Sequence, residues 1–465
     1  MFLTSQMLLS YQRCSRQLFL DLYGDKALKG HPSDFRIKLS KDRIKYRSAF
    51  LESEGNWVRP DYPHQDWEAG ARATLDLMQQ GVPHIHGGVL KVQSPEGHTF
   101  ISTPDLLTRE SGVSVLGSWY YTSTDIKLSK RPKQEYQILA AYHAFLLAQM
   151  QGIDPPESWL YLRDKGWYQV DLDLVLPKLL GLIPDLIAIV QQEFEPEVFI
   201  VRNRCQLCAW FDHCYSRAQH EQHLSLLPGV TPSRYPILLQ HNLRTVEAIA
   251  ALQPHQLNQK TGFGLAVSQQ LIYQARSTVS QRPLLLETPE PFIVLSRVPD
   301  SPIELYFDIE AEPSINVVYL NGVLLVNQIT GHQEFFPFVA ETPDQERQAW
   351  EEFVAFVMAY PQAPIYHFCP YEVQTVKRLA RQYGASGEVL ELLLPRFIDV
   401  HRWITQAVTL PVENYTLKVI ARWIGFEWRN AEANGAQSIC WYEDWLKTGD
   451  RTLLDIILEY NEDDW

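Results

Sequence analysis

The chain has 465 residues, of which 46% are hydrophobic and 12% aromatic. This composition excludes an intrinsically disordered protein, and the length predicts two or three domains that each bury a core of their own. The 41 basic and 55 acidic side chains give a formal net charge of −14, which excludes nucleic-acid binding through overall charge and leaves only local basic surfaces for it.

Basic side chains gather in two short stretches. The first lies between residues 36 and 47, and the second contains Lys127, Lys130, Arg131 and Lys133. Such runs are usually solvated faces. We nevertheless take Lys130, Arg131 and Lys133 as candidate contacts to the phosphates of a nucleic acid.

The chain shows no pattern of a signal peptide or a membrane span. Its most apolar window, residues 172–190, is interrupted by Pro177, Lys178, Pro184 and Asp185, so we expect no membrane-spanning helix there. Six cysteines without a secretion signal are typical of the reducing cytoplasm.

The first 215 or so residues mix strand and helix patterns. Strands are predicted at residues 88–92, 98–108 and 120–127, and a helix at about 133–150. The stretch from about 219 to 290 shows helical patterns only.

The last part of the chain opens with a strand that ends at Glu310, because apolar residues alternate with polar ones from residue 303 onward. Two more strands, at 317–320 and 323–326, flank Asn321-Gly322, which predicts a two-residue hairpin turn.

A further strand at residues 334–339, a helix at about 343–360, a strand at 363–368 and a helix from residue 371 follow. Three antiparallel strands, helix, strand and helix are the order expected of an RNase H-like sheet.

Asp105, Asp125 and Lys127 form a first candidate site. Asp125 and Lys127 are two residues apart on a predicted strand and therefore share a face, and Asp105 lies 20 residues earlier. Two carboxylates can hold Mg²⁺, and a lysine can stabilise a leaving phosphate or lower the pKa of water. Lone D-x-K triplets are common, so this interpretation depends on the order of aspartate, strand and helix.

That order resembles the PD-(D/E)xK nucleases of the RecB type. In this family the helix usually reads Q-x-x-x-Y; Gln137 and Tyr142 are the residues here, although they are five apart. The resemblance also implies an acid or histidine before the sheet, for which Glu68 and His86 are both candidates.

Cys205, Cys208 and Cys214 are spaced closely enough to hold one metal centre. Cys14 supplies a fourth ligand if the N-terminus folds back across the domain, and such a clasp removes loop-closure entropy from the unfolded chain. Four thiolates suit zinc and a 4Fe–4S cluster equally. RecB-type nucleases with an iron–sulfur clasp have the same layout, so the resemblance implies a 4Fe–4S cluster with a structural role.

The middle segment contains Leu227-Pro-Gly229 followed by an apolar stretch at 243–249. This resembles a helix-hairpin-helix element, in which the turn at Gly229 presents backbone N–H groups to a phosphate. Small helical connectors use similar turns, so a nucleic-acid contact and a plain connector both remain open.

Asp308 and Glu310 share one face of their predicted strand, roughly 7 Å apart at about 3.3 Å per residue. Such a pair can hold two divalent cations about 4 Å apart, the arrangement that cleaves phosphodiesters by in-line attack of water. Without further residues, two neighbouring acids on a strand would more simply form a solvated edge.

Asp464 supplies such a further residue. It continues the inward stripe Leu453, Ile457 and Tyr460 of the last predicted helix, and an acid on a buried face requires a cation or a hydrogen-bond donor. We interpret Tyr460 as a group that positions the attacking water or polarises a phosphate oxygen.

These segments resemble the DEDD family of 3′–5′ exonucleases with a tyrosine-xxx-aspartate third motif, over roughly residues 300–465. Asp308 and Glu310 match the first motif, and Tyr460 with Asp464 match the third. Glu372 takes the place of the usual aspartate of the second motif, which changes the expected metal geometry. Because the sequence stops one residue past Asp464, we expect either a shortened chain or a loosely supported last helix.

All three parts in this order resemble a bacterial family of RecB-like nucleases fused to an RNase H-like domain. The resemblance predicts a multidomain α/β chain: a restriction-endonuclease-like domain of RecB type at 1–218, a helical connector at 219–295 and an RNase H-like domain at 296–465. It implies a nuclease dependent on Mg²⁺ or Mn²⁺ in DNA repair or processing, with DNA favoured over RNA. The alternative is a catalytically weak iron–sulfur DNA-binding scaffold that assists a partner helicase or nuclease.

Overall fold

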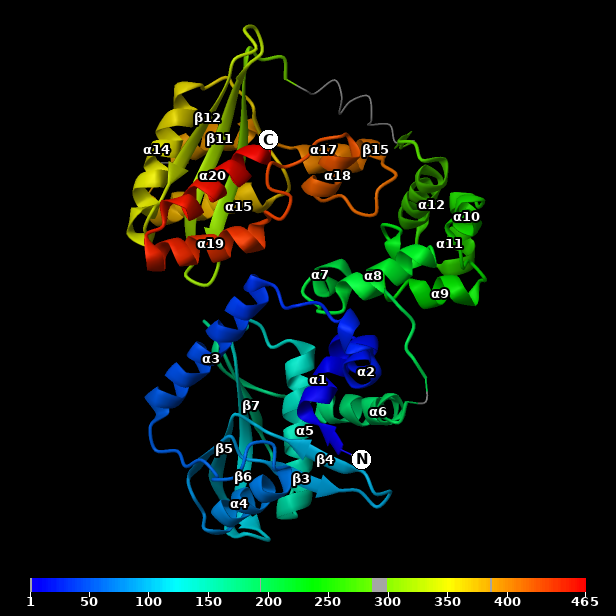
Figure 1. The fold of residues 1–465 in the computed structure, drawn as a ribbon, viewed down its shortest axis with the longest axis vertical. Coiled ribbons are helices and arrows are strands. Elements are labelled where there is room, and N and C mark those ends of the chain that lie inside the picture. The colour runs from blue at the N-terminus through cyan, green and yellow to red at the C-terminus, as the bar shows by residue number, and fades with distance from the viewer. Residues whose placement is uncertain (1, 193, 287–298, 385–386) are drawn as a thin grey trace. The chain divides into compact units, whose positions relative to one another are not determined.

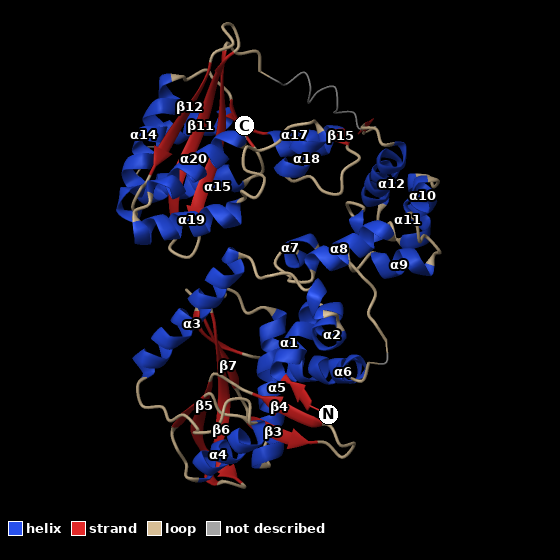
Figure 2. Cartoon of the chain, viewed as in Figure 1, coloured by secondary structure: helices blue, strands red, loops and turns tan. Residues whose placement is uncertain are grey.

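The computed structural model describes residues 2–192, 194–286, 299–384 and 387–465 (Figure 1). The chain divides into two compact units. Unit 1 comprises Met1–Val198 and Arg202–Arg217, and unit 2 comprises Phe199–Val201 and Ala218–Trp465. Each unit mixes helices with sheet, as Figure 2 shows, so the α/β class predicted from the sequence is confirmed.

The larger sheet of unit 1 has five strands in the order β2-β5-β6-β7-β8. Only β6 and β7 run parallel among these neighbours, and they are connected by α5, which packs its buried face against the sheet. These elements are β2 His84–His86, β5 Leu106–Ser114, β6 Gly117–Lys127, β7 Ser158–Leu162, β8 Gly166–Gln169 and α5 Gln134–Gln151.

A second sheet of unit 1 has the order β1-β4-β3, formed by Phe2–Thr4, Thr99–Ser102 and Leu90–Gln93. The predicted strand 98–108 is therefore wrong as one element, since β4 and β5 belong to different sheets. After β4 the chain leaves the three-stranded sheet at Pro104, which has no N–H to donate to a strand ladder. The remaining helices are α1 Ser5–Arg13, α2 Ser15–Tyr23, α3 Asp34–Glu54, α4 Trp67–Gln79, α6 Leu172–Val190, α7 Arg202–Cys205 and α8 Phe211–His220.

The apolar window at residues 172–190 forms α6, with Pro177 and Pro184 inside it. Within the described ranges, no helix combines the length and the apolar character needed to cross a bilayer.

Unit 2 begins with short helices that surround a core of their own, including Leu238, Ile249, Leu257 and Leu271. The predicted helical stretch is thus helical in the structure. Its elements are η2 Leu224–Leu226, α9 Tyr235–Gln240, α10 Val246–Ala250, α11 Pro254–Thr261, α12 Leu265–Ser280 and the short strand β9 Leu284–Leu285. The last predicted connector residues, 287–295, lie outside the described part of the chain.

The main sheet of unit 2 has the order β12-β11-β10-β13-β14. The first three strands are antiparallel, and β13 and β14 run parallel to β10. The strands are β10 Ile303–Glu312, β11 Val317–Asn327, β12 Gln333–Val339, β13 Ile365–His367 and β14 Phe397–Asp399.

Helices cover both faces of this sheet (Figure 1). On one face Phe307 packs against Phe353 of α14 and Leu379 of α15. On the other, Leu320 packs with Tyr442 of α19 and Ile457 of α20. The helices are η3 Pro343–Gln345, α14 Glu346–Ala359, α15 Tyr371–Tyr383, α16 Gly387–Leu393, η4 Leu394–Arg396, α19 Gly435–Thr448 and α20 Arg451–Asp463.

The hairpin predicted at Asn321-Gly322 is wrong. Strand β11 continues through both residues, and Gly322 pairs with Asp308 on one side and Pro337 on the other. The chain reverses instead at residues 313–316 and 328–332. Pairing along the whole length of β11 decided the outcome, because a turn at its middle would expose the ladder of the central strands.

An excursion from the sheet, residues 400–423, joins the connector. It contains α17 Val400–Ala407, β15 Val408–Thr409 and α18 Leu417–Trp423, and β15 pairs antiparallel with β9. The buried Gln274 of α12 donates to the carbonyl of Leu410 (2.8 Å), and Tyr415 donates its hydroxyl to Gln274 (2.7 Å). The excursion thus follows a strand of the main sheet in the chain and is hydrogen-bonded to the connector.

Candidate functional site

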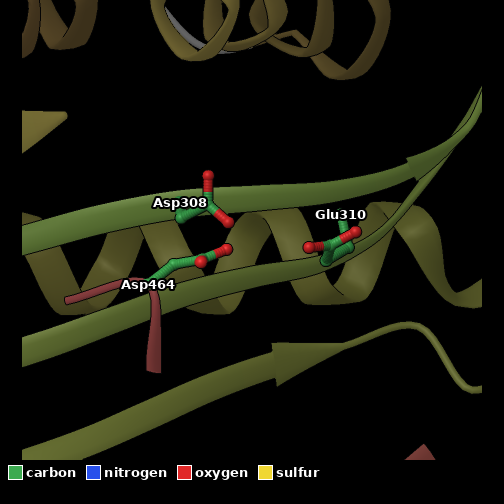
Figure 3. Close-up of side chains that lie close together, drawn as sticks. All are labelled: Asp308, Glu310 and Asp464. Carbon is green, nitrogen blue, oxygen red and sulfur yellow. The ribbon is translucent and has the colours of Figure 1, made fainter. Parts of the chain in front are cut away.

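Asp308, Glu310 and Asp464 converge on one face of the main sheet of unit 2. Asp308 and Glu310 alternate along β10, and Asp464 directly follows the last residue of α20. One carboxylate oxygen from each lies within 4.8 Å of the others, the one such potential metal-ligand group in the described ranges (Figure 3). The sequence-based prediction that these three acids converge is confirmed.

The pKa values of all three carboxyl groups are raised, above all by burial. Burial and then Asp464 and Glu310 hold the pKa of Asp308 well above its usual range. Burial and Asp464 raise the pKa of Glu310 to about 8, and burial raises that of Asp464 to about 6. Ionising all three together is costly in this setting, and a divalent cation among them would remove that cost.

Each of the three acids also receives a neutral hydrogen bond that the sequence did not predict. Trp428 donates Nε1–H to Oδ1 of Asp464 at 2.8 Å. Asn461 donates Nδ2–H to Oδ2 of Asp308 at 2.7 Å. Tyr319 has its hydroxyl 3.4 Å from Oε2 of Glu310 and 2.8 Å from Oγ of Ser438. These donors orient the carboxylates without supplying a competing positive charge.

Tyr460 and Lys418 lie beside the acids. Lys418 Nζ is 4.9 Å from the ring centre of Tyr460 and 5.1 Å from that of Trp428, and it donates to the carbonyl of Ala433. Burial lowers the pKa of Lys418, while Asp464 opposes that shift. Burial and Asp464 raise the pKa of Tyr460 far above its usual range, so its hydroxyl stays protonated at any working pH.

Glu372 lies near the three acids but outside their group. It is buried in the first turn of α15, and its Oε2 is 3.3 Å from Nδ1 of His367. Burial raises the pKa of Glu372, and its charge contributes to the shift at Asp308. The loop before it holds Cys369 at φ 80°, with the Cys369 N–H bonded to Asp399 (3.2 Å). Such a strained backbone costs about 1–3 kcal/mol and persists where surrounding contacts fix it.

The inward stripe of α20 agrees with the prediction at Ile457, Tyr460 and Asp464, which are buried, and differs at its first member. Its buried members are Leu454, Ile457, Tyr460 and Asn461, while Leu453 is only half-buried. The last turn is also better supported than expected, because Arg429 forms ion pairs with Glu462 and Asp463. As predicted, those two acids point away from the group formed with Asp308.

A family model described as the RNase_H superfamily matches residues 305–465. These residues comprise the main sheet of unit 2, its covering helices and all three converging acids. Residues 305–465 form an RNase H-like domain. No curated protein matches the chain.

The RNase H-like domain is consistent with a nuclease, because enzymes with this fold usually hydrolyse phosphodiester bonds.

Unit 1 contains the other predicted site. Lys127 Nζ is 3.1 Å from Oδ2 of Asp125. The carboxylate of Asp105 accepts a hydrogen bond from the N–H of Ile126 at 2.8 Å and forms an ion pair with Arg47 at 3.0 Å. Asp105, Asp125 and Lys127 therefore lie together where β5 and β6 pair.

Asp125 differs in charge state from the acids of the RNase H-like domain. Burial disfavours its ionised form, but Lys127 and His143 outweigh that effect and hold the pKa of Asp125 well below its usual range. Burial likewise opposes the charge of Lys127, yet Asp125 and Asp105 keep the pKa of Lys127 above its usual value.

The helix residues matched to the RecB pattern contact none of these acids. Gln137 donates to the carbonyl of Pro132, and the core residue Tyr142 donates to that of Leu3. The neighbouring His143 occupies the expected place instead: its Nε2 is 3.2 Å from Asp125, and its Nδ1 contacts Ser102. A histidine one helical position later was visible in the sequence, but which face of α5 meets the strand was not.

Of the two candidates before the sheet, only His86 lies beside this site. Its Nδ1 is 2.8 Å from the carbonyl oxygen of Asp105. Glu68 forms a surface ion pair with Lys91 instead.

Cys14, Cys208 and Cys214 lie close enough for Cys14 to raise the pKa of both other thiols, after the larger effect of burial. Cys205 is in α7, whose Arg204 donates to the carbonyl of Arg13 (3.4 Å). The N-terminus therefore folds back to this segment as expected. In the described residues, however, no three of these sulfurs lie within 4.8 Å of one another. The sulfurs of a tetrahedral zinc site, with Zn–S bonds of about 2.3 Å, lie closer together than that.

The predicted phosphate contacts have ordinary structural partners. Gly229 has φ 92° and accepts a hydrogen bond from Arg234, and a Cβ there would lie 2.9 Å from Leu271. Lys130 forms an ion pair with Asp164. Lys133 lies over the ring of Tyr136, and Arg131 is exposed.

Proposed function

We propose that the RNase H-like domain is a nuclease that hydrolyses phosphodiester bonds with Mg²⁺ or Mn²⁺. The observation that carries the proposal is the convergence of Asp308, Glu310 and Asp464, with raised pKa values, in a domain of this superfamily. Carboxylate oxygens are the donors that these hard cations prefer. Acids that are buried together and repel one another are expected to bind a cation, because its charge offsets their repulsion.

Asp308, Glu310 and Asp464 would hold the cations, and Glu372, whose charge contributes to the raised pKa of Asp308, would add a further oxygen. Bound there, divalent cations supply charge neutralisation of the phosphate and a water of lowered pKa. Tyr460 keeps its proton and therefore donates to a phosphate oxygen or orients the attacking water.

The test compares Asp308→Asn and Asp464→Asn with wild type in metal-dependent cleavage of labelled nucleic acid, with every protein carrying Asp125→Asn so that the acids of unit 1 do not contribute. Loss of one ligand should cost several kcal/mol of barrier, and each 1.4 kcal/mol is about tenfold, so we expect activity to fall at least about 100-fold. Asp455→Asn is the matched control, because Asp455 lies on α20 but is exposed and pairs with Arg451. Equal cleavage by wild type and both variants would refute the proposal.

We infer that DNA is the favoured substrate and that cleavage runs 3′ to 5′, since the acid and tyrosine motifs resemble the DEDD exonucleases. Single- and double-stranded DNA and RNA, each labelled at either end, distinguish these possibilities. Salt-sensitive DNA binding without metal-stimulated cleavage would instead support the scaffold that assists a helicase or nuclease.

We further propose that Asp105, Asp125 and Lys127 form a second, RecB-type nuclease site. The support is their clustering with His86 and His143 at the paired ends of β5 and β6. Asp125→Asn should remove whatever metal-dependent cleavage survives Asp308→Asn. If the double variant cleaves as well as Asp308→Asn alone, unit 1 has no nuclease site.

For the cysteines we propose a 4Fe–4S cluster held by Cys14, Cys205, Cys208 and Cys214. The layout of the cysteines, which resembles that of RecB-type nucleases with an iron–sulfur clasp, favours this cluster over zinc, and the cluster would stabilise the return of the N-terminus. Anaerobically purified protein should be brown and absorb near 400 nm, and Cys214→Ser should lose the colour while Cys369→Ser keeps it. Colourless protein that contains zinc would overturn this assignment.

A further inference from the structure

Gly322 occupies an unexpected place for a glycine. It lies in the middle of β11, the strand between β10 and β12, where a glycine weakens a sheet because it has no side chain to pack. Its backbone has no positive φ, so the conformation does not require glycine. The remaining reason for a glycine in a strand is close approach of another group.

The approaching group is the side chain of Asn461. A Cβ on Gly322 would lie 1.7 Å from Oδ1 and 2.9 Å from Cγ of Asn461. Gly322 is also the cross-strand partner of Asp308. The amide of Asn461 therefore lies directly over Gly322 and beside the carboxylate of Asp308.

Asn461 is fully buried, and only one end of its amide is satisfied. Nδ2 donates to Oδ2 of Asp308 at 2.7 Å, whereas Oδ1 has no hydrogen-bond partner in the described structure. A buried polar atom left unpaired costs about 1–3 kcal/mol. An apolar residue at this inward position of α20 would avoid that cost, so stability alone does not account for asparagine.

We propose that Asn461 is a positioning residue that fixes the carboxylate of Asp308 for metal binding, and that Gly322 makes room for it. The amide occupies Oδ2 and so fixes the rotation of the carboxylate beside Glu310 and Asp464. Because the amide is neutral, it adds no charge that would compete with a cation. This inference rests on the proposed function of the RNase H-like domain.

The test measures Mn²⁺ binding to the full chain by calorimetry, together with the Mn²⁺ concentration for half-maximal cleavage. All variants carry Asp125→Asn so that the acids of unit 1 do not contribute. Partners that hold metal ligands in place typically contribute 10–100-fold to metal affinity. We expect Asn461→Ala to weaken Mn²⁺ binding at least about tenfold, with a smaller loss of kcat at saturating Mn²⁺.

Gly322→Ala provides the decisive comparison, because the added Cβ touches no carboxylate and clashes with Oδ1 of Asn461 at 1.7 Å, far more severely than with the ring of Phe335 at 3.1 Å. It should weaken Mn²⁺ binding as much as Asn461→Ala does. The double variant should bind no worse than Asn461→Ala, since the clash disappears with the amide. Gly435→Ala is the control, because a Cβ at Gly435 meets nothing within 4 Å and its φ is not positive.

Failure of this inference is distinguishable from failure of the proposed function. If Asp308→Asn weakens Mn²⁺ binding but Asn461→Ala and Gly322→Ala bind like the parent, Asn461 does not position Asp308. If Gly322→Ala and Asn461→Ala weaken binding additively, Gly322 serves another purpose and the pairing is wrong. If Asp308→Asn leaves Mn²⁺ binding unchanged, the proposed metal site itself is wrong.

Discussion

Neighbouring charges give the acids of the two candidate sites opposite properties. Asp125 has Lys127 at 3.1 Å and His143 at 3.2 Å, so its carboxylate stays ionised. Burial raises the pKa of Glu310 and of Asp464, and Asp464 adds to the shift at Glu310. The nearby Lys418 is itself partly desolvated and opposes these shifts without reversing them. The RNase H-like site therefore has a stronger electrostatic requirement for bound metal than the site in unit 1.

This difference predicts an unusual pH dependence of stability in the presence of a chelator. The folded-state pKa values of Glu310, about 8, and Asp464, about 6, exceed unfolded values of about 4. The folded state therefore binds more protons, and the free energy of unfolding should fall as pH rises from about 4 through 8. Glu310→Gln should flatten the upper part of this fall in urea titrations. A free energy of unfolding that rises over this window would contradict the assignment.

The same shifts predict that metal binding releases protons. Between pH 6 and 8, Mn²⁺ must displace protons from the acids whose pKa values reach about 8 and about 6. Apparent Mn²⁺ affinity should therefore increase with pH over this range, and calorimetry in buffers of different ionisation enthalpy should detect the release. Affinity independent of pH would show that the acids are ionised before metal binds.

At the level of elements, the excursion at residues 400–423 links the connector to the sheet face that carries the three acids. Its β15 and Tyr415 bond to β9 and α12, and its α18 carries Lys418 to the ring of Tyr460. The hydrogen bonds between Gln274 and the excursion are buried, because Gln274 is nearly inaccessible to solvent. We refer to this contact between the connector and the excursion as the joint.

Gln274→Ala should destabilise this joint. It would remove the acceptor of the Tyr415 O–H and the side-chain donor to the Leu410 carbonyl, which would keep only the N–H of Val412. An unsatisfied O–H at this joint costs about 1–3 kcal/mol. Urea denaturation measures the change, with Gln270→Ala as the control on the exposed side of the same helix. Equal effects of the two substitutions would show that the joint contributes nothing to stability.

At the level of the whole molecule, each unit has its own sheet and its own core, and each contains one of the two groups of candidate acids. Sites supported by separate cores are expected to respond independently to substitution.

Independence predicts the outcome of a four-way comparison of wild type, Asp308→Asn, Asp125→Asn and the double variant. Asp125→Asn should leave the Asp308-dependent cleavage within about twofold of wild type, because the effects of mutations at independent sites add within about 0.5 kcal/mol. A tenfold loss of that cleavage on Asp125→Asn would show instead that the two units act on substrate together.

The sequence by itself determined the residues whose positions follow from local periodicity. Alternation along β10 placed Asp308 and Glu310 on one face, and the helical stripe of α20 brought Asp464 inward, because strand and helix repeats fix side-chain direction over a few residues.

Tertiary structure alone decided the contacts between distant segments. Asn321-Gly322 lies within a strand rather than a turn because β11 pairs along its whole length. His143 rather than Tyr142 contacts Asp125, because that face of α5 packs against the strand. It also placed Asn461 beside Asp308, 153 residues away in sequence. Such pairings depend on how whole elements pack together, which no short sequence pattern specifies.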